Sequence, residues 1–242
     1  MRLAVLLIAA AGWAQTPIAA PAIGKMLDAS GTLRPVYGVS GNLILGPPET
    51  VWAISAACSV DLCLAKAGSR IVGPRNSVIA PPGSALFTFD GADAVLYFAA
   101  ADQFSRWHNG RLTRLAWHVD GEVLALGKGE IAVRRGADVW IVRPDGAILD
   151  YLGEVSGPVL LLDGAAVLAS GKDLILRRSD GDEVHFDLPG IRGVSLLGPE
   201  YVQVNTSSSS YALRTTPGRE ELLLLPASPA PPPLRTRRVT LP

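Results

Sequence analysis

The chain has 242 residues, enough for one large all-β domain or for two small domains. Hydrophobic residues make up 48% and charged residues 18%, a composition too apolar for an intrinsically disordered chain. Lys and Arg together number 22, as do Asp and Glu, so there is no net field to attract nucleic acid or an anionic membrane. We therefore expect a folded domain and no nucleic-acid partner.

The first 14 residues are typical of a secretory signal peptide. Arg2 supplies a basic start, residues 3–11 form an apolar stretch, and the small-x-small sequence Gly-Trp-Ala that follows offers a cleavage site. The apolar stretch is shorter than the roughly 20 residues that cross a bilayer, and we predict no transmembrane segment. We expect a signal peptide at 1–14, a linker at 15–24 and export to the periplasm or the medium. The alternatives are an uncleaved anchor and a buried strand.

Two cysteines, Cys58 and Cys63, bracket the tetrapeptide Ser-Val-Asp-Leu. An exported chain meets an oxidising compartment in which a disulfide persists, and residues that flank a tight hairpin turn stand opposite one another within bridging distance. This pair is therefore a disulfide candidate, with two free buried thiols as the alternative. A redox or metal-binding role lacks support, because no further cysteine and no nearby histidine joins the pair.

Similar segments recur along the rest of the chain. DVWIVRPDGAI and DLILRRSDGDE are the clearest pair, and each carries a turn glycine after a run of β-forming residues. A fixed period of this kind is typical of a repeat protein in which each unit is one supersecondary element. Six such glycines are separated by 37, 42, 36, 35 and 37 residues: Gly31, Gly68, Gly110, Gly146, Gly181 and Gly218.

Each unit has the pattern of four short strands. Glycine in the turn supplies the positive φ that two-residue hairpins need, and short apolar or β-branched runs lie on both sides of it. In the unit at 155–189 these runs are 158–163, 165–170 and the two strands around Gly181. No window longer than ten residues has convincing helical periodicity, so we expect very little helix.

Four antiparallel strands about every 36 residues match the blade of a β-propeller. We predict an all-β domain at 25–242 with six four-stranded blades, the closing blade being shared by the N- and C-terminal segments. Five blades with tails, or an open array, are the alternatives. The expected innermost strands end at Gly46, Asp90, Gly127, Asp163 and Gly198. The predicted repeats are 25–37 together with 234–242, 38–75, 76–115, 117–152, 155–189 and 190–226.

Closure of the ring depends on the C-terminal segment. We expect residues 238–241 to pair with the N-terminal hairpin and so to remove an exposed sheet edge. The proline cluster at 229–233 stands where the innermost strand of that blade belongs, and proline cannot donate to a ladder. Three outcomes stay open: no innermost strand, residues 238–241 in its place, or a loose tail.

With this period and its D-x-x-x-x-x-x-D/N-G core, the chain over 25–242 resembles bacterial exported six-bladed β-propellers of the NHL-repeat or TolB-like kind. The resemblance implies the propeller architecture and no particular reaction. The Trp-Asp and Gly-His signatures of WD40 repeats do not recur at repeat phase, and no family's functional residues can be carried over onto this sequence.

Candidate catalytic residues are few. A propeller active site collects polar side chains at the ends of the innermost strands, where Asp90 and Asp163 are expected. Both also open Asp-Gly turns, and two carboxylates fall short of the six to eight oxygens that Ca²⁺ prefers. Glu49 and Asn42 are the further residues that such a site could use. We predict no metal site and no cofactor. The histidines fall at three different phases of the repeat and are not expected to converge: His108, His118 and His185.

Candidate binding residues lie near the longest interval. Its extra residues fall at 73–83, and the neighbouring turn at Gly110 follows a tryptophan and a histidine. Exposed aromatic side chains favour binding, whereas aromatic side chains in a propeller otherwise fill the space between blades. With the two channel carboxylates, the binding candidates are Arg75, Asn76, Trp107, His108, Asp90 and Asp163.

Two recurring polar features have structural interpretations. The serine run at 207–210 is expected to be a turn. Aspartates at repeat phase are expected to accept hydrogen bonds from turn amides and not to form a carboxylate ring. These aspartates are Asp61, Asp102, Asp138 and Asp173.

The sequence thus favours an exported, monomeric, non-catalytic propeller that serves as a scaffold for a protein or an extracellular polymer. Units of 35 to 37 residues leave little beyond four strands and tight turns, so few loops are long enough to carry an active site. The competing hypothesis is a propeller enzyme, a hydrolase, lactonase or sugar oxidoreductase, with a metal site at the central channel.

Overall fold

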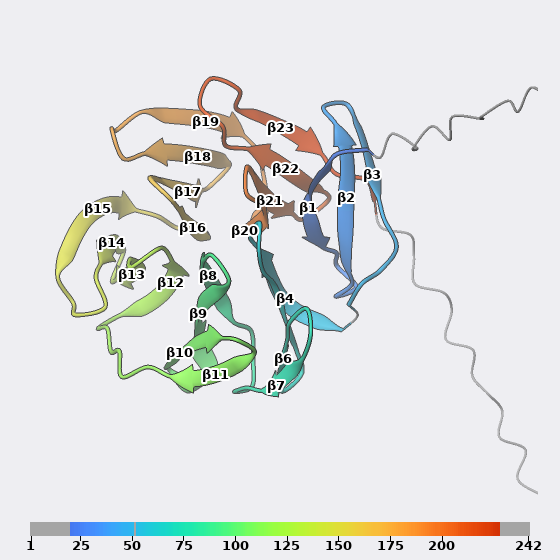
Figure 1. Ribbon diagram of the computed structural model, residues 1–242. Coiled ribbons are helices and arrows are strands. Elements are labelled where there is room, and N and C mark those ends of the chain that lie inside the picture. The colour runs from blue at the N-terminus through green and yellow to red at the C-terminus, as the bar shows by residue number, and fades with distance from the viewer. Residues whose placement is uncertain (1–19, 51, 228–242) are drawn as a thin grey trace, which may run out of the picture.

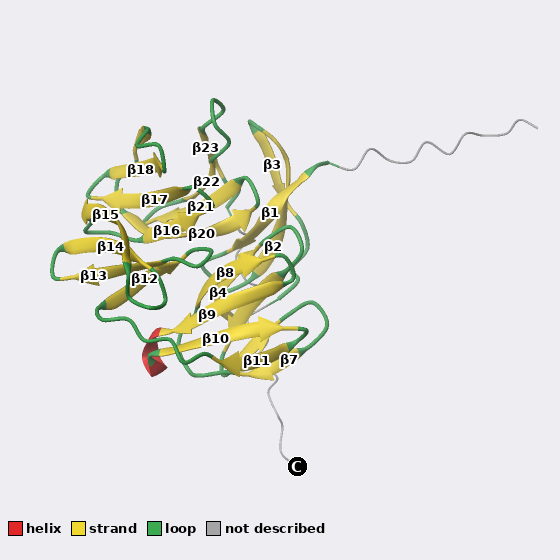
Figure 2. Ribbon diagram, turned by 60° about the vertical axis from the view of Figure 1, so that its left-hand side comes forward, coloured by secondary structure: helices red, strands yellow, loops and turns green. Residues whose placement is uncertain are grey.

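Six antiparallel sheets stand around a common centre in the computed structural model, which describes residues 20–50 and 52–227 (Figure 1). The predicted six-bladed β-propeller is confirmed. Five of the blades have four strands, and the first has three within the described residues. The only helix in this part of the chain is the 3₁₀ turn η1 (Ala99–Ala101), red in Figure 2, so the expected scarcity of helix is confirmed. No helix in the described ranges is long and apolar enough to span a membrane.

The strands follow one another in chain order within every blade. The first blade holds β1 (Ala22–Leu27), β2 (Leu33–Val39) and β3 (Asn42–Leu45). The second holds β4 (Ala53–Cys58), β5 (Cys63–Ala67), β6 (Arg70–Val72) and β7 (Ser77–Ile79). The third holds β8 (Leu86–Asp90), β9 (Asp93–Phe98), β10 (Gln103–His108) and β11 (Arg111–Arg114).

The other three blades repeat this plan. The fourth holds β12 (Glu122–Leu126), β13 (Ile131–Arg135), β14 (Asp138–Val142) and β15 (Ile148–Glu154). The fifth holds β16 (Val159–Leu162), β17 (Ala165–Ser170), β18 (Asp173–Arg178) and β19 (Glu183–Asp187). The sixth holds β20 (Ile191–Gly198), β21 (Tyr201–Thr206), β22 (Ser210–Arg214) and β23 (Glu221–Leu224).

Strand β1 runs antiparallel to the innermost strands on either side of it. Its first residues lie against the end of β20, where Gly24 packs on the Leu197 carbonyl group. Beyond its last residues, the carbonyl oxygen of Gly31 accepts a hydrogen bond of 2.8 Å from the amide of Ala53, at the start of β4. Innermost strands of a propeller run in the same sense, and second strands run in the opposite sense. Because β1 runs opposite to β4 and β20, it occupies the second-strand position of its blade. The first-strand position is not filled by any described residue.

The expected equivalence of the six turn glycines is therefore wrong for two of them. Four of the glycines join the third strand of a blade to the fourth, whereas Gly31 and Gly68 join second strands to third strands. Both kinds of turn need positive φ, 75° at Gly31 and 52° at Gly68, so glycine does not distinguish one hairpin from the next. The four equivalent glycines are Gly110, Gly146, Gly181 and Gly218.

The boundaries of the first two predicted repeats change accordingly. Residues 42–46 are not the innermost strand of the second blade: β3 is the last strand of the first blade, and β4 begins the second. The N-terminal segment supplies three strands instead of one hairpin. The expected closing strand at 234–242, like the signal peptide at 1–14, lies outside the described residues.

The core lies between neighbouring blades. Buried side chains of the second and third blades pack into one cluster that includes Leu64, Ile71 and Leu96. The third and fourth blades share a second cluster, in which the rings of Tyr97 and Phe104 pack with centroids 4.6 Å apart and planes tilted by 40°. These apolar contacts explain why strands buried on both faces have near-continuous hydrophobic runs in the sequence.

Candidate functional site

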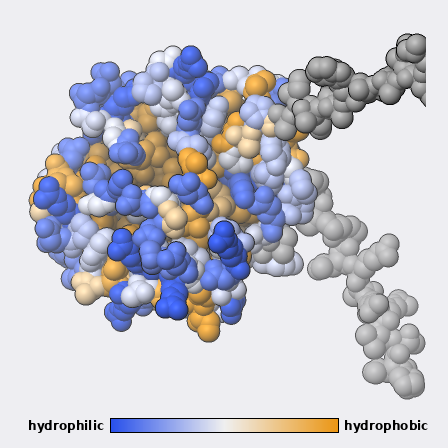
Figure 3. Space-filling model, in the orientation of Figure 1, coloured by the Kyte–Doolittle hydropathy of each residue, from blue (hydrophilic) through white to orange (hydrophobic). Residues whose placement is uncertain are grey.

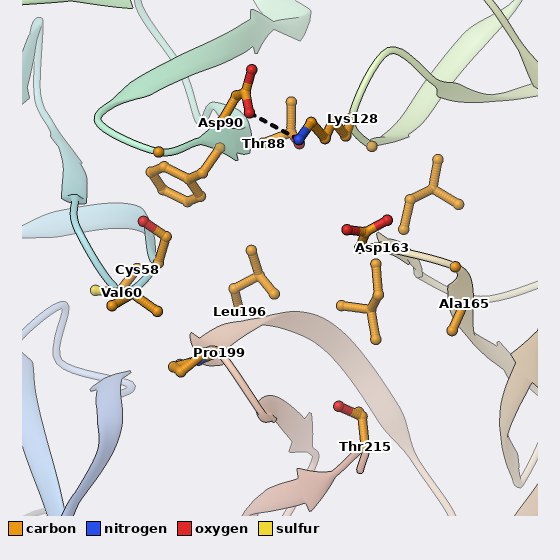
Figure 4. A pocket seen from close by; sticks show the side chains of 18 of the residues that line it. Cys58, Val60, Thr88, Asp90, Lys128, Asp163, Ala165, Leu196, Pro199 and Thr215 are labelled. Carbon is orange, nitrogen blue, oxygen red and sulfur yellow. Dashed lines mark ion pairs between the residues drawn. The ribbon is translucent and has the colours of Figure 1, made fainter. Parts of the chain in front are cut away.

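Five innermost strands end around one cavity of about 450 Å³ at the centre of the ring. Its wall includes the ends of β4, β8, β16 and β20 and the residues that follow β12 (Figure 4). Deeper in the channel, the same five strands enclose a smaller and largely apolar space of about 170 Å³. The channel mouth is therefore where the fold brings polar side chains from different blades together.

Two of the predicted site residues, Asp90 and Asp163, line this mouth. Lys128 lies between them in Figure 4, and its Nζ forms an ion pair of 3.0 Å with Asp90 Oδ1. The hydrogen bond and charge of Asp90 raise the pKa of Lys128, and the charge of Asp163 adds to the increase. The two aspartates also open turns, as expected, with φ of 60° at Gly91 and 70° at Gly164. The mouth thus carries these two carboxylates, an ammonium group that partly neutralises them, and the guanidinium group of Arg178, which is paired with Glu220.

Sequence reasoning missed Lys128. It directly follows the innermost strand β12 and its Gly127, the same position that Asp90 and Asp163 hold near the ends of their strands. The usable signal for Lys128 is its position after an innermost strand, because side chains at that position reach the channel mouth.

The other residues of the hypothetical metal site do not join this group. Glu49 forms an ion pair of 2.5 Å with Lys25, and Asn42 begins the outermost strand of the first blade. Across residues 20–50 and 52–227, no three His, Cys, Asp or Glu side chains come close enough to hold a metal ion.

The three histidines lie apart, as expected. His108 ends β10. Its Nδ1 lies 2.6 Å from Asp93 Oδ1, and its Nε2 lies 2.9 Å from Nδ2 of the Asn109 side chain. His185 lies on the outermost strand of the fifth blade, 3.1 Å from Glu183. His118 lies in the connection between the third and fourth blades. Each histidine therefore faces a different local environment.

The remaining binding candidates are near the outer strands of the second and third blades. Asn76 donates a hydrogen bond of 2.8 Å to the Gly110 carbonyl oxygen, which holds the exposed loop that includes Arg75 against the next blade. Trp107 is only 2% exposed and packs beside Gly73 in the core between these blades. Trp107 is therefore a packing residue, and the prediction that it lies on a binding surface is wrong.

Two of the recurring aspartates accept hydrogen bonds from tyrosines. Asp102 accepts one of 3.0 Å from Tyr97, and Asp138 accepts one of 2.6 Å from Tyr151. Burial, followed by the hydrogen bond and charge of Asp102, raises the pKa of Tyr97 to about 12. These carboxylates fasten neighbouring strands of one blade, and their bonds run to tyrosine hydroxyls where turn amides were expected.

The cysteine pair shapes the rim of the mouth. Cys58 and Cys63 form a disulfide across the β4–β5 hairpin, with their Cα atoms 4.1 Å apart. At the tip of this hairpin Val60 is 77% exposed. Val60 lines both the central cavity and a neighbouring cavity of about 440 Å³ beside β1. The disulfide therefore holds the exposed Val60 side chain between two hollows, with the exposed carboxylate of Asp61 next to it.

The chain matches no protein-family model and no curated protein sequence. It is similar to solved propeller structures at low sequence identity. PorZ, an essential surface component of the type-IX secretion system of Porphyromonas gingivalis, superposes with a TM-score of 0.56 at 12% identity over 89% of this chain and 38% of PorZ.

Superpositions on two further structures include most of this chain and most of the other protein. A streptogramin B lyase superposes with a TM-score of 0.47 at 9% identity, over 87% of this chain and 85% of the lyase. Hsv2 of Kluyveromyces lactis superposes with a TM-score of 0.47 at 8% identity, over 81% of this chain and 74% of Hsv2. This chain spans less than half the length of PorZ, and at such identities the likeness concerns the fold alone. The chain is a six-bladed β-propeller.

Proposed function

We propose that the chain is a non-catalytic propeller that binds a protein partner over the face at which the innermost strands end. The observation that carries this proposal is Val60, a large apolar side chain 77% exposed near the centre of that face. Exposed apolar anchors near the centre of a surface, with hollows beside them, are typical of binding hot spots.

The disulfide supports this role for Val60. A hairpin closed between Cys58 and Cys63 loses little conformational entropy when a partner immobilises its tip, because the unbound tip is already constrained. Pro199 lies beside Val60 on the same side of the mouth, and Pro217 also lines the cavity (Figure 4). These residues add rigid apolar surface.

The charged side of the mouth supplies polarity for orientation. Asp163 stands across the pocket from Val60 in Figure 4, next to the ion pair of Asp90 and Lys128. The side chains of Asp90 and Lys128 are each more than half exposed, so a partner can form hydrogen bonds with them without breaking a buried network. Hydrophobic residues lie around the middle of the face drawn in Figure 3, with polar residues among and around them. An apolar centre with a polar rim is the usual composition of a protein interface.

Export and a monomeric state belong to the same proposal. A disulfide is stable in the periplasm or outside the cell and rare in the cytosol, which supports the sequence-based expectation of a signal peptide. N-terminal sequencing of the exported chain tests the cleavage after residue 14. Light scattering of the mature chain tests whether residues 15–242 form a monomer of one domain.

The test of the binding face uses the mature chain, immobilised, against the exported fraction of the cells that make it. Val60→Asp places a charge at the proposed anchor. Ile79→Asp is the matched control, because Ile79 is also 77% exposed but ends β7, which runs opposite to β4 and so ends away from the mouth. A protein retained by the wild type and by Ile79→Asp, but lost with Val60→Asp, is then purified and titrated by calorimetry. Retention that is equal for all three, or no retained protein, contradicts the proposal.

A further inference from the structure

A second cavity, of about 590 Å³, lies at the opposite end of β20 from the channel mouth. Arg192, near the start of β20, lines this cavity, whereas Gly198 at its other end lines the mouth. Arg192 and Gly198 are six residues apart on this strand, which corresponds to about 20 Å, so the two sites are well separated. The end of β1, the β21–β22 turn, the last residue of β23 and residues 225–227 complete the wall.

One wall is rich in hydroxyl groups. The serine run forms the β21–β22 turn, as the sequence predicts, and Thr206 Oγ1 holds it by accepting a hydrogen bond of 3.0 Å from the Ser209 amide. The hydroxyl groups of Ser207 and Ser209 make no hydrogen bond within the described ranges, and both residues line the cavity. The turn therefore presents unused donors and acceptors in a fixed geometry.

Asn205 adds an amide to this wall. Its Oδ1 accepts hydrogen bonds from Ser210 Oγ at 2.7 Å and from Gln203 Nε2 at 2.8 Å. With the oxygen engaged, the Nδ2 group is left as a donor that no other described residue uses. The hydrogen bond from buried Gln203 holds the Asn205 side chain in place at the cavity wall.

Apolar residues make up another part of the wall, next to the serine turn, because the Leu225 amide donates a hydrogen bond of 2.9 Å to the Ser210 carbonyl oxygen. Met26 and Leu225 are buried, and Leu224 is 62% exposed. All three line the cavity, together with Pro226. A cavity that pairs an apolar wall with a row of hydroxyl groups matches a pyranose ring, which has C–H faces and hydroxyl edges.

The charge of the cavity comes from Arg192. It is exposed, and its guanidinium group forms no ion pair or hydrogen bond with another described residue. The other ionisable residue in the wall is Asp28, which is buried and accepts hydrogen bonds of 2.9 Å from the amides of Ser30 and Thr32. Arg192 is thus the charged group that a ligand can reach, and a guanidinium group binds carboxylates in a bidentate fashion.

We propose that this cavity binds a uronic acid residue of an acidic saccharide. Arg192 binds the sugar carboxylate, the hydroxyl groups of Ser207 and Ser209 and the amide of Asn205 bind the sugar hydroxyl groups, and the apolar wall packs on the ring. The site lies away from the proposed protein-binding mouth, so the chain could hold a saccharide and a protein at the same time.

Calorimetry of the mature chain with trigalacturonate tests this site. Maltotriose is the neutral probe of the same length, and inorganic phosphate tests for a simple anion site. We expect trigalacturonate to bind and maltotriose to bind at least tenfold more weakly. Arg192→Ala should lower the affinity for trigalacturonate at least tenfold, because the substitution removes a charged hydrogen-bonding partner. Ser207→Ala/Ser209→Ala should weaken it several-fold.

Matched controls come from the third blade. Arg111 and Thr113 are exposed on β11, and Arg111→Ala and Thr113→Ala should leave the affinity unchanged. Equal affinity for the acidic and neutral sugars, binding of phosphate alone, or an affinity that Arg192→Ala does not change would each overturn the proposal. None of these results bears on the Val60 surface, so the two proposals fail or stand separately.

Discussion

The side chain of Gln203 hydrogen bonds to both backbone groups of Leu27, 176 residues away in the sequence. Its Oε1 accepts from the Leu27 amide at 3.0 Å, and its Nε2 donates to the Leu27 carbonyl oxygen at 2.7 Å. This is the inner edge of β1, where the first blade lacks an innermost strand among the described residues. One buried glutamine thus supplies the bonds that a neighbouring strand would otherwise make.

Replacing Gln203 by leucine should be costly. The substitution keeps the volume but leaves the part-buried Leu27 amide and carbonyl groups without their partners, and we expect a loss of about 1–2 kcal/mol in the free energy of unfolding. The control is Gln103→Leu, since Gln103 donates only one hydrogen bond, to Ser105. Urea unfolding of both variants measures the difference, and equal losses would mean that Gln203 does not close the edge of β1.

The contact between the first and sixth blades depends on Gly24. A Cβ atom at this position would overlap the Leu197 carbonyl oxygen, and φ is 152°, a conformation that other residues rarely adopt. We expect Gly24→Ala to lower the free energy of unfolding by more than about 3 kcal/mol, because β1 must move away from β20. Gly41→Ala is the control. Its φ is 82°, but no atom lies within 4 Å of the added Cβ, so we expect a loss of about 1 kcal/mol. Similar urea midpoints for the two variants would contradict this account.

Buried Lys66 should make stability depend on pH. Its side chain is fully buried in β5, where Nζ donates to the Gly68 carbonyl oxygen, and burial lowers its pKa from the ordinary value of 10.5. Between the lowered pKa and 10.5 the unfolded chain binds more protons than the folded chain, so the stability rises with pH over that window. Lys66→Met removes this group.

The test compares wild type and Lys66→Met by chemical unfolding at several pH values between 7 and about 10.5. The wild type should gain stability relative to Lys66→Met as the pH rises, and the variant should be the more stable of the two at pH 7. Parallel stability curves across this range would show that the lysine has the same pKa in the folded and unfolded chains.

Removal of the disulfide should weaken the fold moderately. The sequence separation of the two cysteines is 5, and the chain-entropy relation gives about 2 kcal/mol for so short a loop. We expect Cys58→Ser/Cys63→Ser to lose about this much in urea unfolding, with the sheets intact by circular dichroism. Titration of free thiols in the unfolded wild type confirms the oxidised state. A wild type with two reactive thiols would remove the rigid support proposed for Val60.

Part of the candidate site was predictable from sequence position alone. Asp90 and Asp163 follow strands of the same type at the same phase of the repeat, so the propeller geometry directs both to the channel mouth. Arg192 and Gln203 each occur once, without a counterpart at the same phase in other blades, and no periodic signal marks them. The role of Gln203 arises from its hydrogen bonds to Leu27, between the two ends of the described chain.

Most strands and turns were predictable from the residues, because apolar runs and turn glycines act through neighbours close along the chain, and their period predicted six blades. Which hairpins are equivalent depends instead on packing, since positive φ serves the Gly31 turn as well as the Gly218 turn. The direction of β1 depends likewise on its packing between β4 and β20. Its contact with β20 joins Gly24 to Leu197, more than 150 positions away, and no local pattern encodes it.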